Sequence, residues 1–143
     1  MNRYLCDTTC LVATVSSWHE HHDRTRAEID RRANRGEELV LAAHSLAETF
    51  SVLTRLPAPH RLRAADALAV IEANWRSTPV VHLTGAETWG AIREATRLGA
   101  SGGRMYDALI AQAALKVQAE TILTWNLRDF APFAAEIRVE APA

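Results

Sequence analysis

The chain alternates short apolar runs with segments of helical periodicity, and this alternation constrains its fold more than any other feature. Apolar runs of four or five residues predict buried strands. Strands separated by helices favour a parallel sheet with crossover connections. A length of 143 residues suits one domain, so we expect a single α/β domain over residues 1–143. The predicted strands are residues 3–7, 39–42, 79–83, 121–124 and 136–139.

Helices are predicted between these strands, where apolar residues recur at helical spacing. Pro57 and Pro59 should end one of them, because proline cannot continue a helix. Residues 8–18 contain many β-branched side chains, yet a helix is the favoured interpretation there. Residues 19–38 are polar and charged. The predicted helices are residues 8–18, 44–56, 60–75, 86–98 and 105–118.

The composition argues against a membrane or secreted protein. Hydrophobic residues make up 48% and charged residues 23% of the chain, which is ordinary for a globular protein. No apolar run approaches the roughly 20 residues of a membrane span, and the N-terminus does not resemble a secretory signal. We therefore expect a cytoplasmic protein without a membrane partner. Cys6 and Cys10 are the only cysteines, and we expect buried thiols, not a disulfide or a zinc site.

The formal net charge is −1, so any contact with nucleic acid must come from local patches. Fifteen of the 16 basic residues are arginines, either because arginine matches phosphate geometry or because the genome favours it. Arg93 and Arg97, one helical turn apart, are the preferred substrate contacts. A second candidate face, which could equally be a solvated surface, carries Arg24, Arg31 and Arg35.

Four acidic residues each follow or closely neighbour one of the apolar segments. Open parallel sheets bind ligands outside the carboxyl ends of their strands, so we expect these acids to meet at one edge of the sheet. The four residues are Asp7, Glu48, Asp107 and Asp129.

Each acid also has an ordinary structural interpretation. Asp7 could cap a helix, and Ser45 with Glu48 matches a capping box. Asp107 would favour the dipole of its helix, and Asp129 could form a turn. Taken together the four are harder to explain, because two carboxylates about 4 Å apart repel by roughly 4 kcal/mol. Such a cluster survives if a cation neutralises it or if protons are taken up.

The chemistry of these donors favours a hard cation. Carboxylate oxygens without cysteine or histidine suit Mg²⁺ or Mn²⁺ better than zinc. A cation held by them can activate water and stabilise charge on a phosphodiester. The four acids therefore predict a metal-dependent nuclease.

The segments around the acids resemble those of PIN domains, specifically VapC-type toxins of bacterial toxin–antitoxin pairs. The resemblance spans essentially the whole chain. It implies a three-layer α/β/α fold with a central five-stranded parallel sheet, Mg²⁺ or Mn²⁺ dependence, and endonucleolytic cleavage of RNA. It also implies a homodimer and inhibition by a small antitoxin. The segments are Cys6-Asp7-Thr8-Thr9, Ala47-Glu48-Thr49, Tyr106-Asp107-Ala108-Leu109-Ile110-Ala111 and Thr124-Trp125-Asn126-Leu127-Arg128-Asp129-Phe130.

The resemblance assigns roles to individual residues. Asp129 corresponds to the fourth acid, although many family members carry an acid where Asn126 stands. Thr8, Thr124 and Asn126 are expected to support the site. The three core metal-binding acids correspond to Asp7, Glu48 and Asp107.

The tryptophans offer faces on which RNA bases could stack. Trp125, just past a predicted strand end and near Asp129, is the best candidate. The others are expected in the core or at the antitoxin interface.

Other functions fit the sequence less well. His19 and His22 could bind a transition metal, but no convincing third ligand lies nearby. A phosphatase with an aspartyl nucleophile would need an acid where Thr9 stands, and a receiver domain fails for similar reasons. The remaining alternative is a catalytically impaired module that binds nucleic acid or protein, its site weakened at Asn126.

Overall fold

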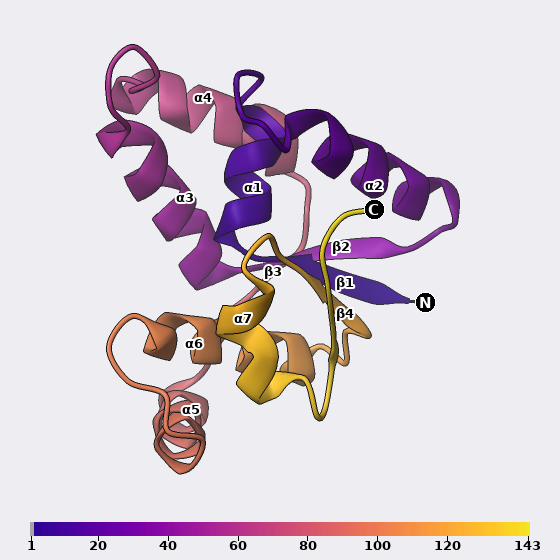
Figure 1. Ribbon diagram of the computed structural model, residues 1–143, viewed down its shortest axis with the longest axis vertical. Helices are drawn as coiled ribbons and strands as arrows, with labels where there is room; N and C mark the ends of the chain where they lie inside the picture. Colours follow the sequence, from indigo (N-terminus) through magenta and orange to yellow (C-terminus); the bar gives the residue numbers. More distant parts are fainter. Residues whose placement is uncertain (1) are drawn as a thin grey trace.

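Five parallel strands form the central sheet in the order β3-β2-β1-β4-β5 in a computed structural model, which describes residues 2–143 (Figure 1). All four strand pairs are parallel, as the alternation of strands and helices predicts. The strands are β1 (Arg3–Cys6), β2 (Glu38–Ala42), β3 (Val80–Val81), β4 (Thr121–Leu123) and β5 (Arg138–Glu140).

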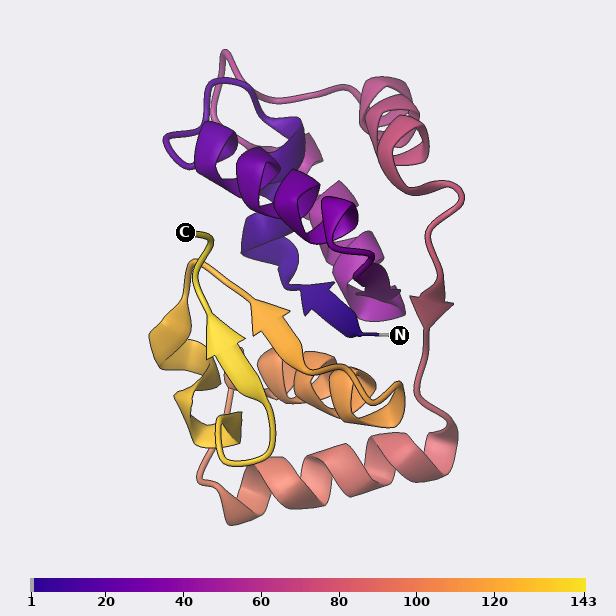
Figure 2. The ribbon, with the colours of Figure 1, turned by 90° about the vertical axis from the view of Figure 1, so that its right-hand side faces the viewer.

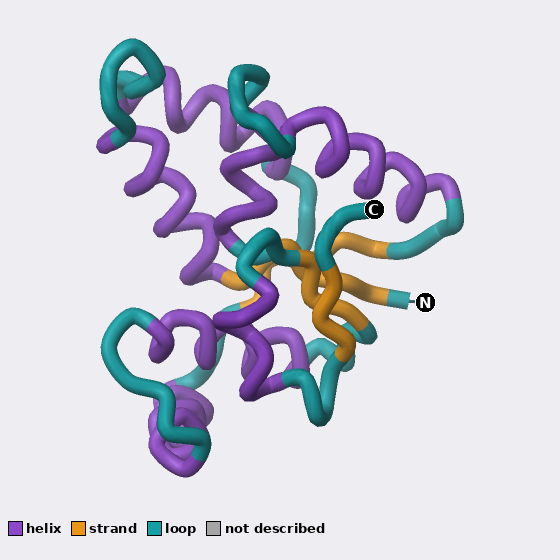
Figure 3. The backbone as a smooth tube through the Cα atoms, in the orientation of Figure 1, coloured by secondary structure: helices purple, strands orange, loops and turns teal. Residues whose placement is uncertain are grey.

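Helices cover both faces of the sheet, which confirms the three-layer α/β/α arrangement (Figures 1 and 2). Figure 3 shows the strands enclosed between the two helical layers. One layer contains α1 (Thr8–Val15), α2 (His22–Asn34), α3 (Ala43–Arg55) and α4 (Ala64–Trp75). The other contains α5 (Gly85–Arg97), α6 (Arg104–Lys116), α7 (Leu127–Phe130) and the 3-10 turn Ala131–Phe133.

Alternation along β1 divides the core between the two layers. Tyr4 and Cys6 pack with Leu11 beneath the first layer, whereas Leu5 packs with Ile110 of α6 beneath the second. Successive side chains of a strand point to opposite faces of a sheet, and all of these side chains are buried. The strands are therefore covered on both faces, as parallel sheets usually are.

The chain order places a topological switch point between β1 and β4. From β1 the chain moves outward through β2 to β3, then returns to the other side of β1 as β4 and continues to β5. Ligands of such sheets bind at the carboxyl ends of the strands flanking this point. Asp7 follows β1 there, and Thr124 follows β4.

Several element boundaries differ from the sequence prediction. The strand predicted at residues 79–83 is limited to Val80–Val81, since β3 is an edge strand that pairs only with β2. The helix predicted at 8–18 ends at Val15, and the helix predicted at 60–75 begins at Ala64. The polar stretch 19–38 contains α2, whose 13 residues make about three and a half turns.

Two further expectations concern the cysteines and membranes. Cys6 and Cys10 are free and buried, as predicted. Within residues 2–143, none of the helices is both long and apolar enough to cross a membrane.

Candidate active site at the carboxyl edge of the sheet

Asp7 lies at the end of β1 and is the N-cap of α1. Its Oδ1 accepts hydrogen bonds from the Cys10 N–H (3.1 Å) and the Thr9 hydroxyl (2.6 Å), and its Oδ2 accepts one from the Thr124 hydroxyl (2.6 Å). The residue is 3% exposed. Burial raises the pKa of Asp7 to about 6 although these hydrogen bonds oppose the shift, and the Glu48 carboxylate adds to the rise. Asp7 therefore caps α1, and its ionised form is disfavoured by burial.

Thr124 joins the ends of the two strands that flank the switch point. Its hydroxyl donates to Asp7 and accepts the Asn126 N–H at 2.8 Å. Beside it, the Thr9 hydroxyl accepts the Trp125 N–H at 3.0 Å. These bonds hold the loop after β4 against the start of α1, so the supporting position predicted for Thr124 has a physical basis.

Thr124→Val is expected to lower the free energy of unfolding by about 1–3 kcal/mol, because a buried carboxylate and a backbone N–H both lose a partner. Thr124→Ser keeps the hydroxyl and should retain most of the stability. Urea unfolding of the two variants measures the difference. Equal stabilities would show that the hydroxyl is not needed to hold Asp7.

Glu48 is not part of a capping box, contrary to one interpretation of the sequence. The helix α3 begins at Ala43, and its N-cap, Ala42, makes no side-chain cap. Ser45 therefore lies inside the helix, where its hydroxyl is buried without a hydrogen-bond partner. The Glu48 carboxylate is free of a capping role and contacts Nε2 of His44 at 3.3 Å.

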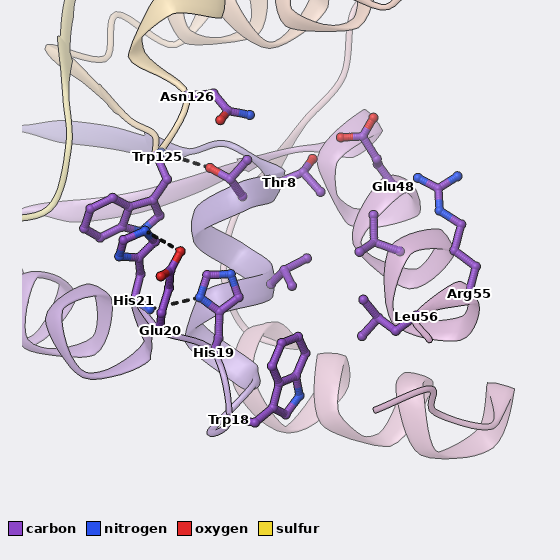
Figure 4. Close-up of a pocket in the computed structure, with 13 residues that line it drawn as sticks. Thr8, Trp18, His19, Glu20, His21, Glu48, Arg55, Leu56, Trp125 and Asn126 are labelled. Atoms are coloured by element: carbon purple, nitrogen blue, oxygen red, sulfur yellow. Dashed lines mark hydrogen bonds and ion pairs between the residues drawn. The ribbon is translucent and has the colours of Figure 1, made fainter. Parts of the chain in front are cut away.

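Glu48 lines a cavity of about 750 Å³ (Figure 4). Thr8 and Asn126 line the same cavity. The Thr8 hydroxyl is buried and has no hydrogen-bond partner. Buried polar atoms are rarely left unpaired, so this hydroxyl marks a place where a ligand can supply the missing contact.

Asp107 lies in the first turn of α6. Burial raises its pKa to about 7, and the carboxylates of Asp129, Asp7 and Glu48 add to the rise in that order, while Arg104 opposes it. Like charges shift a pKa in this way only when they are close. The other three predicted acids therefore all act on Asp107, and the four carboxylates form an electrostatic cluster centred on it.

The fourth position of the site is divided between two residues. Asn126 lines the cavity that contains Glu48, whereas Asp129 lines a second cavity, of about 510 Å³, that contains Asp107. Asp129 is the strongest carboxylate influence on Asp107. Asn126 therefore belongs to the Glu48 side of the cluster and Asp129 to the Asp107 side.

The cluster suits a divalent cation in its chemistry. Its donors are carboxylate oxygens with the unpaired Thr8 hydroxyl beside them, and two of the carboxyl groups have raised pKa values. Within residues 2–143, no three His, Cys, Asp or Glu side chains are already gathered as a metal-binding group. Mutual repulsion opposes a closer approach of the acids, and a cation would offset it.

Neither Arg93 nor Arg97, the arginines predicted to contact substrate, lines the two cavities that contain the acids. Arg93 is exposed on α5, and Arg97 pairs with Glu94. Instead, Arg104 lines the cavity of Asp107 and Arg55 lines that of Glu48. Both could have been found in the sequence, because they stand three and seven residues from those acids and so share a helical face with them.

The second arginine face is also largely engaged. Arg31 pairs with Glu28, and Arg35 pairs with Glu37. Arg24 lies over the ring of Trp125, with 5.5 Å between the guanidinium carbon and the ring centroid. Arg31 and Arg35 nevertheless remain exposed, so their ion pairs do not decide between a solvated surface and a contact with RNA phosphates.

The Trp125 ring is held by contacts within the protein and is not an open surface for stacking a base. Its ring stacks on His21 with centroids 3.8 Å apart, and its Nε1 donates to the Thr25 hydroxyl at 2.8 Å. Trp75 is buried in the core, whereas Trp18 and Trp89 are exposed.

The two histidines considered for a transition metal have other partners. Nδ1 of His22 contacts the Ala13 carbonyl at 2.7 Å, and Nδ1 of His19 accepts the His21 N–H at 3.0 Å. Their geometry gives no support to a metal site there.

Comparison with known proteins places this arrangement in a family. The PIN domain model matches residues 4–134. The chain is 37% identical over 134 residues to Ribonuclease VapC40 of Mycobacterium tuberculosis, covering 94% of this chain and 93% of the relative. It is 40% identical over 114 residues to Ribonuclease VapC27 of the same organism, covering 80% and 78%. Its fold matches DNA-bound VapBC from Salmonella typhimurium with a TM-score of 0.72 and 24% identity over 100% of both chains. The chain therefore belongs to the PIN-domain family, and its relatives within that family are VapC ribonucleases.

Proposed function

We propose that this protein is a divalent-metal-dependent endoribonuclease and the toxin of a toxin–antitoxin pair. The observation that carries the proposal is the electrostatic cluster of four carboxylates at the switch point of the sheet. The four acids come from four separate segments, so their meeting is a property of the fold and not of local sequence. The relatives named as ribonucleases make RNA the favoured substrate.

The four acids of the cluster would bind a cation together. Asp7, Glu48 and Asp107 would hold Mg²⁺ or Mn²⁺, with Asp129 assisting on the side of Asp107. A bound cation of this kind stabilises developing charge on a phosphodiester and lowers the pKa of water. Oxygen donors without thiols or imidazoles favour these hard ions.

The protein's own groups would position the substrate. Thr9 and Thr124 fix both oxygens of Asp7, so the carboxylate cannot rotate away. Arg104 and Arg55 offer a positive charge on each side of the acids, where they can contact phosphates. Without these charges, four carboxylates would repel the RNA backbone.

An antitoxin and a second copy of this chain are the proposed protein partners. Large apolar side chains are exposed on α3 and α4, at Phe50 and Leu68, and on α5, at Trp89 and Ile92. Exposed apolar patches commonly mark protein interfaces. The structural relative from Salmonella typhimurium is a VapBC complex, which supports the expectation of a small antitoxin.

The test is cleavage of RNA by the purified protein with Mg²⁺, with Mn²⁺ and with chelator alone. We expect cleavage only when one of the cations is present. Asp7→Asn should remove it, whereas Asp66→Asn should not, because Asp66 is an exposed carboxylate paired with Arg63. Absence of metal-dependent cleavage on every class of RNA would favour the binding module, and cleavage that persists in Asp7→Asn would reject this site.

A further inference from the structure

One wall of the cavity beside Glu48 is built from aromatic rings. Trp18 stacks on His60 with centroids 4.0 Å apart and contacts His19 at 5.6 Å. The ring centroids of His19 and His21 are also 5.6 Å apart, and His21 stacks on Trp125. The five rings form a continuous row from the loop before α4 to the loop after β4. None of the functions assigned above to the acids uses this row.

The row leads from the acid cluster into the cavity. Figure 4 shows Asn126, Thr8 and Glu48 at one end of the cavity and Trp18 at the other. Arg55 stands on the side opposite the rings. A nucleotide whose phosphate lies at the acids can therefore direct its base along the rings.

Trp18 is the ring best placed to receive a ligand. It is 45% exposed, and the stack on His60 occupies only one face. Trp125, by contrast, is stacked on His21 and hydrogen bonded through its indole N–H. An indole ring that stacks on His60 with one face and is partly exposed can stack a ligand on its other face.

His19 adds a hydrogen-bond donor of fixed position. Its Nδ1 accepts the His21 N–H, so in the neutral ring the proton is on Nε2. Burial and the neighbouring His21 lower the pKa of His19, which favours that neutral form. The cavity thus offers a flat apolar surface beside a directional donor, which suits a planar heterocycle with an acceptor on its edge.

We propose that this cavity binds an unpaired nucleobase of the RNA next to the cleaved bond, with Trp18 as the stacking surface and His19 as the donor that reads the base. The inference rests on the proposed function for the identity of the polymer. Proteins recognise RNA sequence through unstacked bases that stack on aromatic side chains and hydrogen bond at their edges. A base held in a duplex cannot enter, so the cavity selects single-stranded RNA. A protein side chain is the competing occupant, and continuity with the acid cluster favours the base.

The test measures binding separately from cleavage. Fluorescence anisotropy with labelled octamers of uridine, cytidine or adenosine, in chelator, gives affinities that do not depend on catalysis. An octamer of the same backbone without bases is the reference probe. Native protein should bind at least one homopolymer more tightly than the abasic octamer, and Trp18→Ala should weaken that binding about 5- to 150-fold without changing the abasic value.

Matched variants make the result specific. Val80→Ala removes another exposed large apolar side chain, on β3, and should leave both the homopolymer and the abasic affinities unchanged. Trp18→Phe keeps an aromatic face and should retain most of the affinity, while His19→Ala should change the order of preference among the homopolymers. If Trp18→Ala does not fold, Trp18→Leu decides, because it keeps apolar bulk without an aromatic face.

The outcomes separate this inference from the proposed function. Trp18-dependent binding without cleavage by native protein would support the base site and reject the nuclease. Cleavage by native protein with equal homopolymer binding by native and Trp18→Ala would keep the nuclease and overturn the base site, leaving the cavity to a protein partner. In an active enzyme, Trp18→Ala should also relax the nucleotide preference at one position of a randomised RNA.

Discussion

Asp107→Asn is expected to lower RNA cleavage by about 10³-fold or more, and at the same time to stabilise the protein in chelator at neutral pH. The first effect follows because a cation contributes several kcal/mol to the transition state, and each 1.36 kcal/mol is about tenfold in rate. The second follows because the amide carries no charge in a cluster of carboxylates. A residue kept only for folding would show the opposite sign in stability.

The sign of the stability effect comes from the raised pKa values. Asp107 has a pKa of about 7 and Asp7 one of about 6, against an ordinary value of 3.8. Near pH 3 both carboxyl groups are protonated in the folded and in the unfolded chain, so they do not lower the free energy of unfolding. Between about pH 4 and 7 the unfolded chain releases these protons first, so folding stability falls as the pH rises.

The expected loss for Asp107 at pH 7 is about 2–4 kcal/mol, after allowing for screening of a group that burial shields only in part. Urea unfolding in chelator at pH 5 and pH 8 measures it. Native protein should be less stable at pH 8, and Mn²⁺ should restore stability, because a ligand of the folded state alone stabilises it. Asp107→Asn should show a smaller pH difference and a weaker response to Mn²⁺.

Asp66→Asn is the control, because its carboxylate is exposed and outside the cluster. It should retain cleavage and the pH dependence of the native protein. An Asp107→Asn protein that is less stable than native at pH 8 in chelator would contradict the electrostatic account of the cluster. One that still cleaves RNA would remove Asp107 from the site.

The acids of the site could be predicted from sequence because each stands at a boundary that local patterns reveal. Asp7 follows an apolar run, and Asp107 precedes one. Parallel topology then brings strand ends to one edge whatever the details of packing. The capping box matched at Ser45 failed for a related reason. The N-cap of α3 is Ala42, at the end of β2, and this shift of three residues puts Ser45 inside the helix.

The ring row could not be predicted in the same way. Trp18 lies in the turn after α1, and His60 lies in the loop before α4. Neither segment has a periodic pattern, and 42 residues separate the two rings along the chain. Their contact depends on where α1 ends and where α4 begins. Helix boundaries are the part of a fold that sequence patterns specify least well. Trp125 lines the cavity that contains Glu48, but only the packing of His21 shows that one face of its ring is occupied.

Arg32→Met is expected to cost about 3–5 kcal/mol of folding stability, the range for breaking a buried ion pair by removing one partner. Arg32 on α2 is 5% exposed and bonds Glu28 (2.9 Å), Glu37 (2.8 Å) and Glu140 (3.2 Å). Methionine keeps an apolar stem but lacks the guanidinium, whose carbon lies 5.1 Å from the centroid of the Tyr4 ring, so the loss is that of the charge and its contacts. Three carboxylates would then face one another without their shared cation.

The consequence extends to the proposed base site, because α2 supports the ring row. Thr25 of this helix accepts the indole N–H of Trp125, and His21 immediately precedes the helix. Loosening α2 should therefore weaken homopolymer binding while leaving the abasic octamer less affected.

Arg35→Met is the matched control, since Arg35 pairs with Glu37 from an exposed position and such pairs contribute about 0–1 kcal/mol. Thermal and urea unfolding of both variants decide the comparison, with a fall in Tm of roughly 10–20 °C expected for Arg32→Met alone. Equal stability of the two variants would mean that the desolvation of Arg32 cancels its three ion pairs. In that case α2 would be held by Thr25 and its apolar contacts, and the ring row would tolerate loss of the charge.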